Sequence, residues 1–151
     1  MLELGLLEDH LTQSAKAVLN TMCFLQPFVG EGPSHEDRQK LVCMQVSFKG
    51  PHNGRFVLGA GDDTANVLAP AFLGSGDEDL AGSQSRDVLA EMANIICGAT
   101  VSHIEPEGLF RLGSPELVAP MPAPDEKAVE LALDCGCGLL LLQLSLDKNI
   151  L

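Results

Sequence analysis

One stretch, DVLAEMANIICGATVSH at residues 87–103, contains the side chains best suited to catalysis or binding. Two acids, an amide and a glycine recur there at steps of four, three and four residues: Asp87, Glu91, Asn94 and Gly98. On a helix this spacing puts them in one line, which we call the acid–amide ridge. A carboxylate accepts hydrogen bonds, an amide both donates and accepts them, and a glycine leaves a gap. The ridge therefore has the groups needed to bind another molecule.

Helix stability does not account for this ridge. Asp87 and Glu91 are like charges one turn apart, which costs roughly a few tenths of a kcal/mol. Asn94 is a mediocre mid-helix residue, and Gly98 costs about 1 kcal/mol relative to alanine. A solvated helix face with arbitrary polar residues remains the alternative, and the ridge alone does not exclude it.

The helix that would carry the ridge is predicted by apolar residues recurring at steps of three and four: Val88, Met92, Ile95, Ile96 and Ala99. Its beginning is open, because Asp77 could cap it or a fresh start could fall near Ser85. Pro106 and Gly108 mark its end.

The chain before this helix contains two more helices and a hairpin. In order, the pattern predicts a helix at 6–25, a loop or short turn of helix at 34–40, strands at 41–50 and 55–60, and a short helix at 64–73. The step Asn53-Gly54 is the strongest short hairpin signal. Asp62 and Asp63 supply an acidic N-cap for the short helix, and Gly74 ends it.

The chain after this helix is rich in strands. Brief strands are predicted at 109–112 and 116–119, then an exposed connection with three prolines at 120–124, then strands at 127–135 and 136–146. The last strand is the most continuously apolar, so we expect it near the centre of the sheet.

A chain of 151 residues is expected to form a single domain, 1–151. The order of elements repeats a helix followed by two strands, which gives two halves at about 1–74 and 75–151. The first helix carries Asp9, Gln13 and Lys16 at the spacing of Asp87, Glu91 and Asn94. The shared layout favours a degenerate duplication.

Composition excludes several classes of partner. The net charge is −12, from 9 basic and 21 acidic residues, with no basic cluster. Nucleic acid and anionic membrane surfaces are therefore disfavoured as partners. No apolar segment approaches the roughly 20 residues that span a bilayer, and acids near the N-terminus argue against a signal peptide. We expect a cytoplasmic protein.

Cysteines and histidines form no recognisable site. The five cysteines lie in apolar runs and are expected to be reduced, buried thiols: Cys23, Cys43, Cys97, Cys135 and Cys137. Metal or redox use of Cys135 and Cys137 is disfavoured, because zinc sites need CxxC-type spacing and further ligands. The four histidines are scattered, no catalytic triad is spaced correctly, and His103 is explained as a favourable partner of the helix dipole.

The spacing Asp87-x3-Glu91-x2-Asn94, followed about twenty residues later by a proline, resembles the signature of the CheC/CheX/FliY family of chemotaxis phosphatases. Pro115 is the matching proline, at a slightly shorter interval than is usual in the family. Ile95-Ile96-Cys97-Gly98 and the segment DDTANVLAPAFLG at 62–74 are also similar to the family.

The resemblance implies an α/β (α+β) fold with pseudo-symmetric helix-plus-hairpin repeats, whose long helices pack beside a mostly antiparallel sheet. Because Gln13 and Lys16 stand where a second motif would need Glu and Asn, the chain resembles single-site, CheX-like members. Homodimers formed through the sheets are common in such proteins. The apolar strand at 138–146 fits that pairing and equally fits an ordinary core strand.

The implied substrate is the aspartyl phosphate of a CheY-like response regulator. Asn94 would aim the attacking water, and Glu91 would pair with the regulator's active-site lysine. Asp87, Gly98 and Pro115 would contact the partner. No cofactor or metal of its own is implied, and Mg²⁺ would sit on the regulator. A non-catalytic binding or scaffold module for a response regulator is the alternative.

Overall fold

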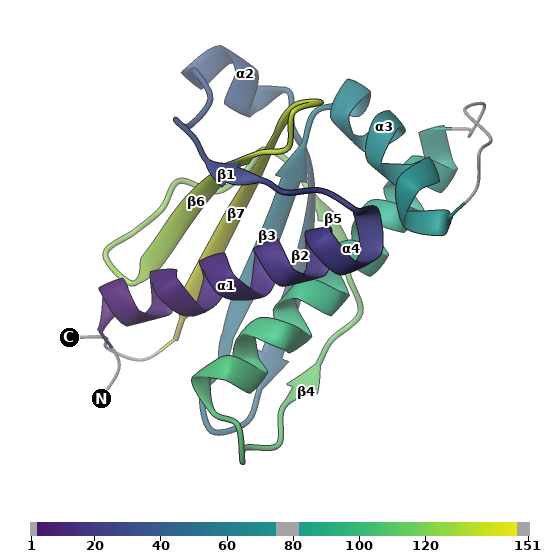
Figure 1. Ribbon diagram of the computed structural model, residues 1–151. Coiled ribbons are helices and arrows are strands. Elements are labelled where there is room, and N and C mark those ends of the chain that lie inside the picture. Colours follow the sequence, from purple (N-terminus) through teal and green to yellow (C-terminus); the bar gives the residue numbers. More distant parts are fainter. Residues whose placement is uncertain (1–2, 75–81, 148–151) are drawn as a thin grey trace.

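Antiparallel strands and two long helices dominate the computed structural model, which describes residues 3–74 and 82–147 (Figure 1). The helices are α1 (Leu4–Cys23), α2 (His35–Gln39), α3 (Asp62–Leu73) and α4 (Gly82–Ile104). The strands are β1 (Phe28–Val29), β2 (Val42–Lys49), β3 (Gly54–Ala60), β4 (Arg111–Leu112), β5 (Glu116–Val118), β6 (Ala128–Asp134) and β7 (Leu139–Leu146). Within these ranges no helix has both the length and the apolar character needed to cross a membrane.

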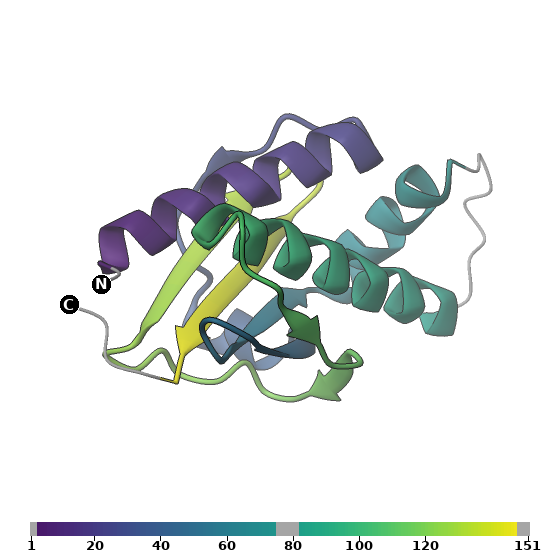
Figure 2. The same cartoon turned by 90° about the horizontal axis from the view of Figure 1, so that it is seen from below.

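All the strands join one antiparallel sheet, and α1 and α4 lie across the same face of it (Figure 2). The strand order is β1-β6-β7-β3-β2-β4, with β5 also paired to β2. The hairpins β2–β3 and β6–β7 meet at the centre through the pair β3–β7. The predicted fold class, with helix-plus-hairpin units and a mostly antiparallel sheet, is confirmed.

The last strand is central, as its apolar sequence predicts. β7 lies between β6 and β3, and its residues Leu140, Leu142 and Leu144 are fully buried under the helices. Both of its edges are occupied within the chain. This strand is therefore a core strand and offers no free edge for pairing with a second copy.

Two local predictions differ from the structure, and a third lies outside the described residues. The short helix α3 begins after Gly61, whose extended backbone occupies the N-cap position without a side-chain hydrogen bond, so the predicted acidic cap is wrong. Asp62 and Asp63 instead occupy the first turn, where the helix dipole favours negative charge. α4 begins at Gly82 rather than near Ser85, and the alternative cap Asp77 lies outside the described residues.

A short edge strand was not predicted. β1 follows α1 and pairs with β6, with Phe28 opposite Asp134. Two residues carry too little periodicity to reveal a strand, so only the partner strand makes it one. The polar run before β2 does form the short helix α2, capped by Ser34 through a hydrogen bond from the Asp37 backbone N–H.

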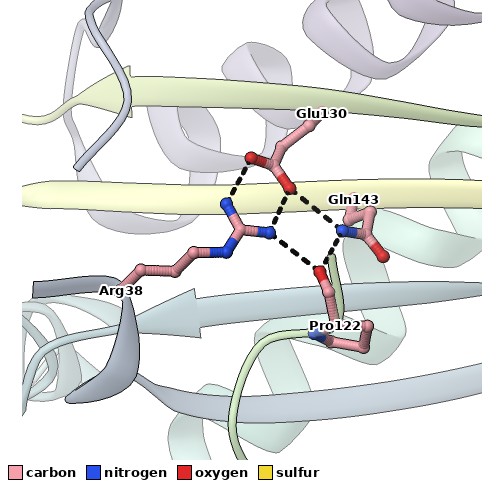
Figure 3. Close-up of polar contacts among 4 residues, drawn as sticks. All are labelled: Arg38, Pro122, Glu130 and Gln143. Carbon is pink, nitrogen blue, oxygen red and sulfur yellow. Dashed lines mark hydrogen bonds and ion pairs between the residues drawn. The ribbon is translucent and has the colours of Figure 1, made fainter. Parts of the chain in front are cut away.

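The proline connection is not simply exposed, because it closes a polar network on the sheet face opposite α1 and α4 (Figure 3). Arg38 of α2 donates to both carboxylate oxygens of Glu130, at 2.6 and 2.7 Å, and to the Pro122 carbonyl at 2.8 Å. Gln143, buried on β7, donates to the same carbonyl and to Glu130. Burial raises the pKa of Glu130, but the hydrogen bonds from Arg38 and Gln143 outweigh it and hold the pKa below its ordinary value.

We expect Glu130→Gln to lower the free energy of unfolding by about 2 kcal/mol, because it removes a charge-assisted, bidentate acceptor from a shielded arginine. The folded-state pKa of Glu130 is depressed, so this contribution is complete above its ordinary pKa of 4.5 and is lost as pH falls through the lower folded value. Urea unfolding at neutral and acidic pH measures both effects.

Glu36→Gln is the matched control, because it breaks the exposed ion pair of Glu36 with Lys40 at 3.4 Å. Its effect should stay below about 0.5 kcal/mol. An equal loss of unfolding free energy in the two variants would contradict the stabilising role of Glu130.

Candidate functional site

The acid–amide ridge lies on the outward side of α4. The opposite side of the helix is buried against α1, β2 and β3 through residues that are almost fully shielded: Val88, Leu89, Met92, Ala93, Ile96 and Cys97. Asp87 and Glu91 are exposed, while Asn94 and Gly98 are half-buried. The structure thus brings all four predicted residues to one side of one rigid element.

The polar groups of this ridge are not used by the chain itself. Among residues 3–74 and 82–147, the side chains of Asp87, Glu91 and Asn94 have no hydrogen-bond or ion-pair partner. Both carboxylates and the amide are therefore available to a second molecule. The arrangement offers two acceptors and one group that both donates and accepts.

Side-chain hydrogen bonds hold α4 near both ends. Near its start, the buried Ser85 hydroxyl donates to Asn66 Oδ1 of α3 at 2.8 Å. Near its end, His103 Nδ1 lies 2.8 Å from the Ser14 hydroxyl of α1 and 2.9 Å from the Ala99 carbonyl oxygen. The ridge is consequently fixed relative to α1 and α3.

Sequence reasoning missed two of these supports, Asn66 and Ser14. Ser14 is fully buried and lies beside the apolar stripe of α1, so a polar residue at a core position was the available signal. Nothing in the sequence around Asn66 singles it out. His103, predicted only as a partner of the helix dipole, does occupy the last turn of α4 and also links it to α1.

The predicted proline lies on the sheet edge that runs beside α4. Pro115 is half-buried between β4 and β5, which pair in turn with β2. At Gly98 the nearest neighbour from this edge is Leu112 of β4, 3.7 Å from where a Cβ would stand. Pro115 follows three residues further along the same edge.

The counterpart of the ridge on α1 has the same spacing but different chemistry. Asp9 and Gln13 are exposed and Lys16 is half-buried. A carboxamide and an ammonium group replace the Glu and Asn of α4. Substitutions on this surface of α1 can therefore serve as controls for substitutions in the acid–amide ridge.

Neither a metal centre nor a reactive thiol accompanies the ridge. In the described part of the chain, no group of three His, Cys, Asp or Glu residues could hold a metal ion. All five cysteines are free thiols, and four of them are buried as predicted, whereas Cys137 is half-buried. Burial raises the pKa of Cys97 to about 12 and, with nearby Cys137, Asp134 and Cys23, that of Cys135 to about 12, which suppresses the nucleophilic thiolate.

The sequence of this chain matches the model of a known protein family. Residues 42–130 match the family model described as chemotaxis phosphatase CheX, over more than half of the chain. The chain belongs to the CheX family. The matched span includes the acid–amide ridge and Pro115. Among curated proteins, the sequence has no significant match.

Solved structures of CheX and CheC-like proteins share the fold. A CheX from Desulfovibrio desulfuricans superposes with a TM-score of 0.73 at 18% identity, covering 93% of this chain and 99% of that one. A CheC-like protein from a Shewanella species gives 0.73 at 14% identity, covering 94% and 97%. CheX in a CheX–CheY–BeF₃–Mg²⁺ complex from Borrelia burgdorferi gives 0.69 at 15% identity, covering 93% and 97%. At these identities the similarity shows the fold.

Gly98→Ala tests whether the fold needs the glycine. The Cβ would meet Leu112 at an ordinary van der Waals distance, so we expect the free energy of unfolding to rise by about 0.5–1 kcal/mol from improved helix propensity. Thermal or urea unfolding of the purified variant measures this. A loss of stability would mean that the glycine serves internal packing rather than access to the ridge.

Proposed function

We propose that this CheX-family protein is a phosphatase for the aspartyl phosphate of a CheY-like response regulator, acting in the cytoplasm. The observation that carries the proposal is the pair Glu91 and Asn94, both without partners among the described residues, on the outward side of a helix that is otherwise firmly packed. The family's description as a chemotaxis phosphatase and a CheX relative solved with CheY support this choice of substrate.

Hydrolysis of an acyl phosphate needs a water molecule held in line with the leaving carboxylate. In the proposed mechanism the Asn94 amide inserts into the regulator's active site and orients that water through its carbonyl and its N–H₂ group. An amide is not a strong base, so catalysis comes from positioning. In this mechanism the chain would supply no nucleophile, and the Mg²⁺ ion would be held by the regulator.

Glu91, one turn before Asn94, would form an ion pair with the regulator's active-site lysine and so fix the depth of insertion. Asp87, a further turn away, would contact the docked partner. Gly98 would let the partner's backbone approach α4, since its missing side chain leaves room beside Leu112. Pro115 would shape the neighbouring edge.

A non-catalytic scaffold for the same regulator is the second candidate. It is favoured by the shorter interval between Asn94 and Pro115 and by the absence of Glu and Asn from the α1 counterpart. Ridge side chains without internal partners serve binding as well as catalysis. Pairing of this chain into homodimers stays a prediction in either case.

Asn94→Ala separates these two functions. Mixing the protein with a phosphorylated CheY-like regulator should accelerate phosphate loss, and the variant should lower this rate by about 100-fold because the water is no longer oriented. Binding of the regulator should survive. The measurements are phosphate release and regulator affinity under the same conditions.

Gln13→Ala is the matched control, since it removes a carboxamide from the equivalent surface of α1 and should leave the rate unchanged. Binding by the wild-type protein without acceleration would establish the scaffold. No binding to any regulator would exclude both functions.

Glu91→Ala is expected to act mainly on docking. Removing the carboxylate that pairs with the regulator's lysine should weaken binding by about tenfold and raise KM. Titration of the regulator at several salt concentrations measures this, because salt screens an ion pair and should weaken wild-type binding more than binding of the variant. An unchanged affinity with a normal KM would remove Glu91 from the proposed site.

A further inference from the structure

The sheet face opposite α1 and α4 carries two arginines in contrasting environments. Arg38 of α2 donates to the Glu130 carboxylate at 2.6 Å and to the Pro122 carbonyl at 2.8 Å (Figure 3). Arg55 on β3 is also partly shielded, yet no carboxylate of the described residues lies within ion-pair distance of it. A guanidinium is always charged at physiological pH, so it requires acceptors.

Strand register places a hydroxyl on each side of Arg55. Ser47 of β2 and Ser145 of β7 are its direct cross-strand neighbours. Directly opposed residues point to the same sheet face, with Cβ atoms about 4.5–5.5 Å apart. Ser47, Arg55 and Ser145 therefore form a row of hydrogen-bond donors across three adjacent strands.

Two atoms of this row have no partner despite being buried. Arg55 Nε and Ser145 Oγ are both shielded from solvent, and neither forms a hydrogen bond with the residues that the structure describes. Ser145 is only 5% exposed, whereas Gln143, two residues earlier on the same face, donates two hydrogen bonds through Nε2. Buried polar groups are nearly always paired, so two adjacent exceptions make this row a candidate binding site.

The charged side chains around the row favour an anionic ligand. Lys49 lies on the same face one diagonal step from Arg55, and Arg111 of β4 lies directly opposite Lys49. Thus three of the chain's nine basic residues converge here although its net charge is −12. Asp147, two residues beyond Ser145, is exposed and forms no ion pair with Arg55.

We propose that this row is a binding site for a phosphate-type oxyanion, with the Arg55 guanidinium as its centre. The planar fork of arginine matches two oxygens of such a group, and the flanking hydroxyls of Ser47 and Ser145 reach the remaining oxygens. Binding through Nε and Ser145 Oγ would require the Arg55 side chain to move, because both atoms are shielded from solvent. Lys49 and Arg111 supply further positive charge at the rim.

This oxyanion site is separate from the acid–amide ridge. The ridge is on α4, which packs on the face formed by Met44, Val46 and Phe48 of β2, whereas Ser47 and Arg55 point to the other face. The site can therefore be occupied or removed without touching Glu91 or Asn94. Its test does not depend on phosphatase activity.

Isothermal titration calorimetry with inorganic phosphate at low ionic strength tests the proposal directly. The wild-type protein should bind one phosphate, and Arg55→Gln should weaken binding by about tenfold or more. Ser145→Ala should also weaken it, which a purely structural serine would not do. Asp147→Asn should tighten binding, because it removes a nearby negative charge.

Arg86→Gln is the matched control, since it removes one positive charge from α4 and should change the affinity by less than about twofold. Phenyl phosphate serves as a second probe: tighter binding than inorganic phosphate identifies an esterified phosphate as the ligand, and weaker binding identifies the free ion. Acetate should compete poorly, because a planar carboxylate cannot engage both hydroxyls and the guanidinium.

Circular dichroism confirms that each variant is folded. If Arg55→Gln does not fold, Arg55→Lys tests the role of the guanidinium, because it keeps the charge and loses the planar fork. This variant should bind phosphate more weakly than the wild type. Absence of phosphate binding by the wild type, or equal binding by wild type and the folded Arg55 variant, overturns the proposal. Equal competition by acetate would also overturn the assignment to a phosphate-type group.

Discussion

The packing of α4 against α1 and the sheet sets which side chains of this helix face outward. Met92, Ala93, Ile96 and Cys97 are almost completely buried, so the helix has only one rotation about its axis that hides them. That rotation turns the acid–amide ridge outward. Hydrogen bonds from Ser85 to α3 and between Ser14 and His103 then fix the helix near its ends. A surface that positions a water molecule needs this rigidity more than it needs reactive groups.

The two faces of the sheet are built from different interactions. The face under α1 and α4 is apolar, with Phe48, Phe56 and the leucines of β7 at its centre. The opposite face combines a small apolar cluster around Met121 and Leu141 with a polar network around Glu130. Hydrophobic burial thus positions the ridge, while directional hydrogen bonds attach α2 and the proline connection. Polar groups left without partners on that second face are therefore exceptions within an otherwise satisfied arrangement.

The helices α1 and α4 differ in chemistry at equivalent outward positions. Both helices bury an apolar stripe against the same sheet face, and both present an acid followed by polar residues at equal spacing. Packing against the sheet requires the apolar stripe of each helix but does not constrain the residues that face outward. Gln13 and Lys16 on one helix, and Glu91 and Asn94 on the other, are therefore free to differ without changing the fold.

Sequence alone predicts the helix periods, the hairpin at Asn53-Gly54, the central position of the last strand and the spacing of the ridge. These features are local, because periodicity and turn chemistry act within a few residues. Only the tertiary structure decided that Phe28 and Val29 form a strand and that Pro122 accepts hydrogen bonds from Arg38 and Gln143. It also decided that Arg55 faces Ser145 rather than a carboxylate. Each of these depends on a partner far away in the chain, and the register between distant strands is set by the packing of the whole sheet.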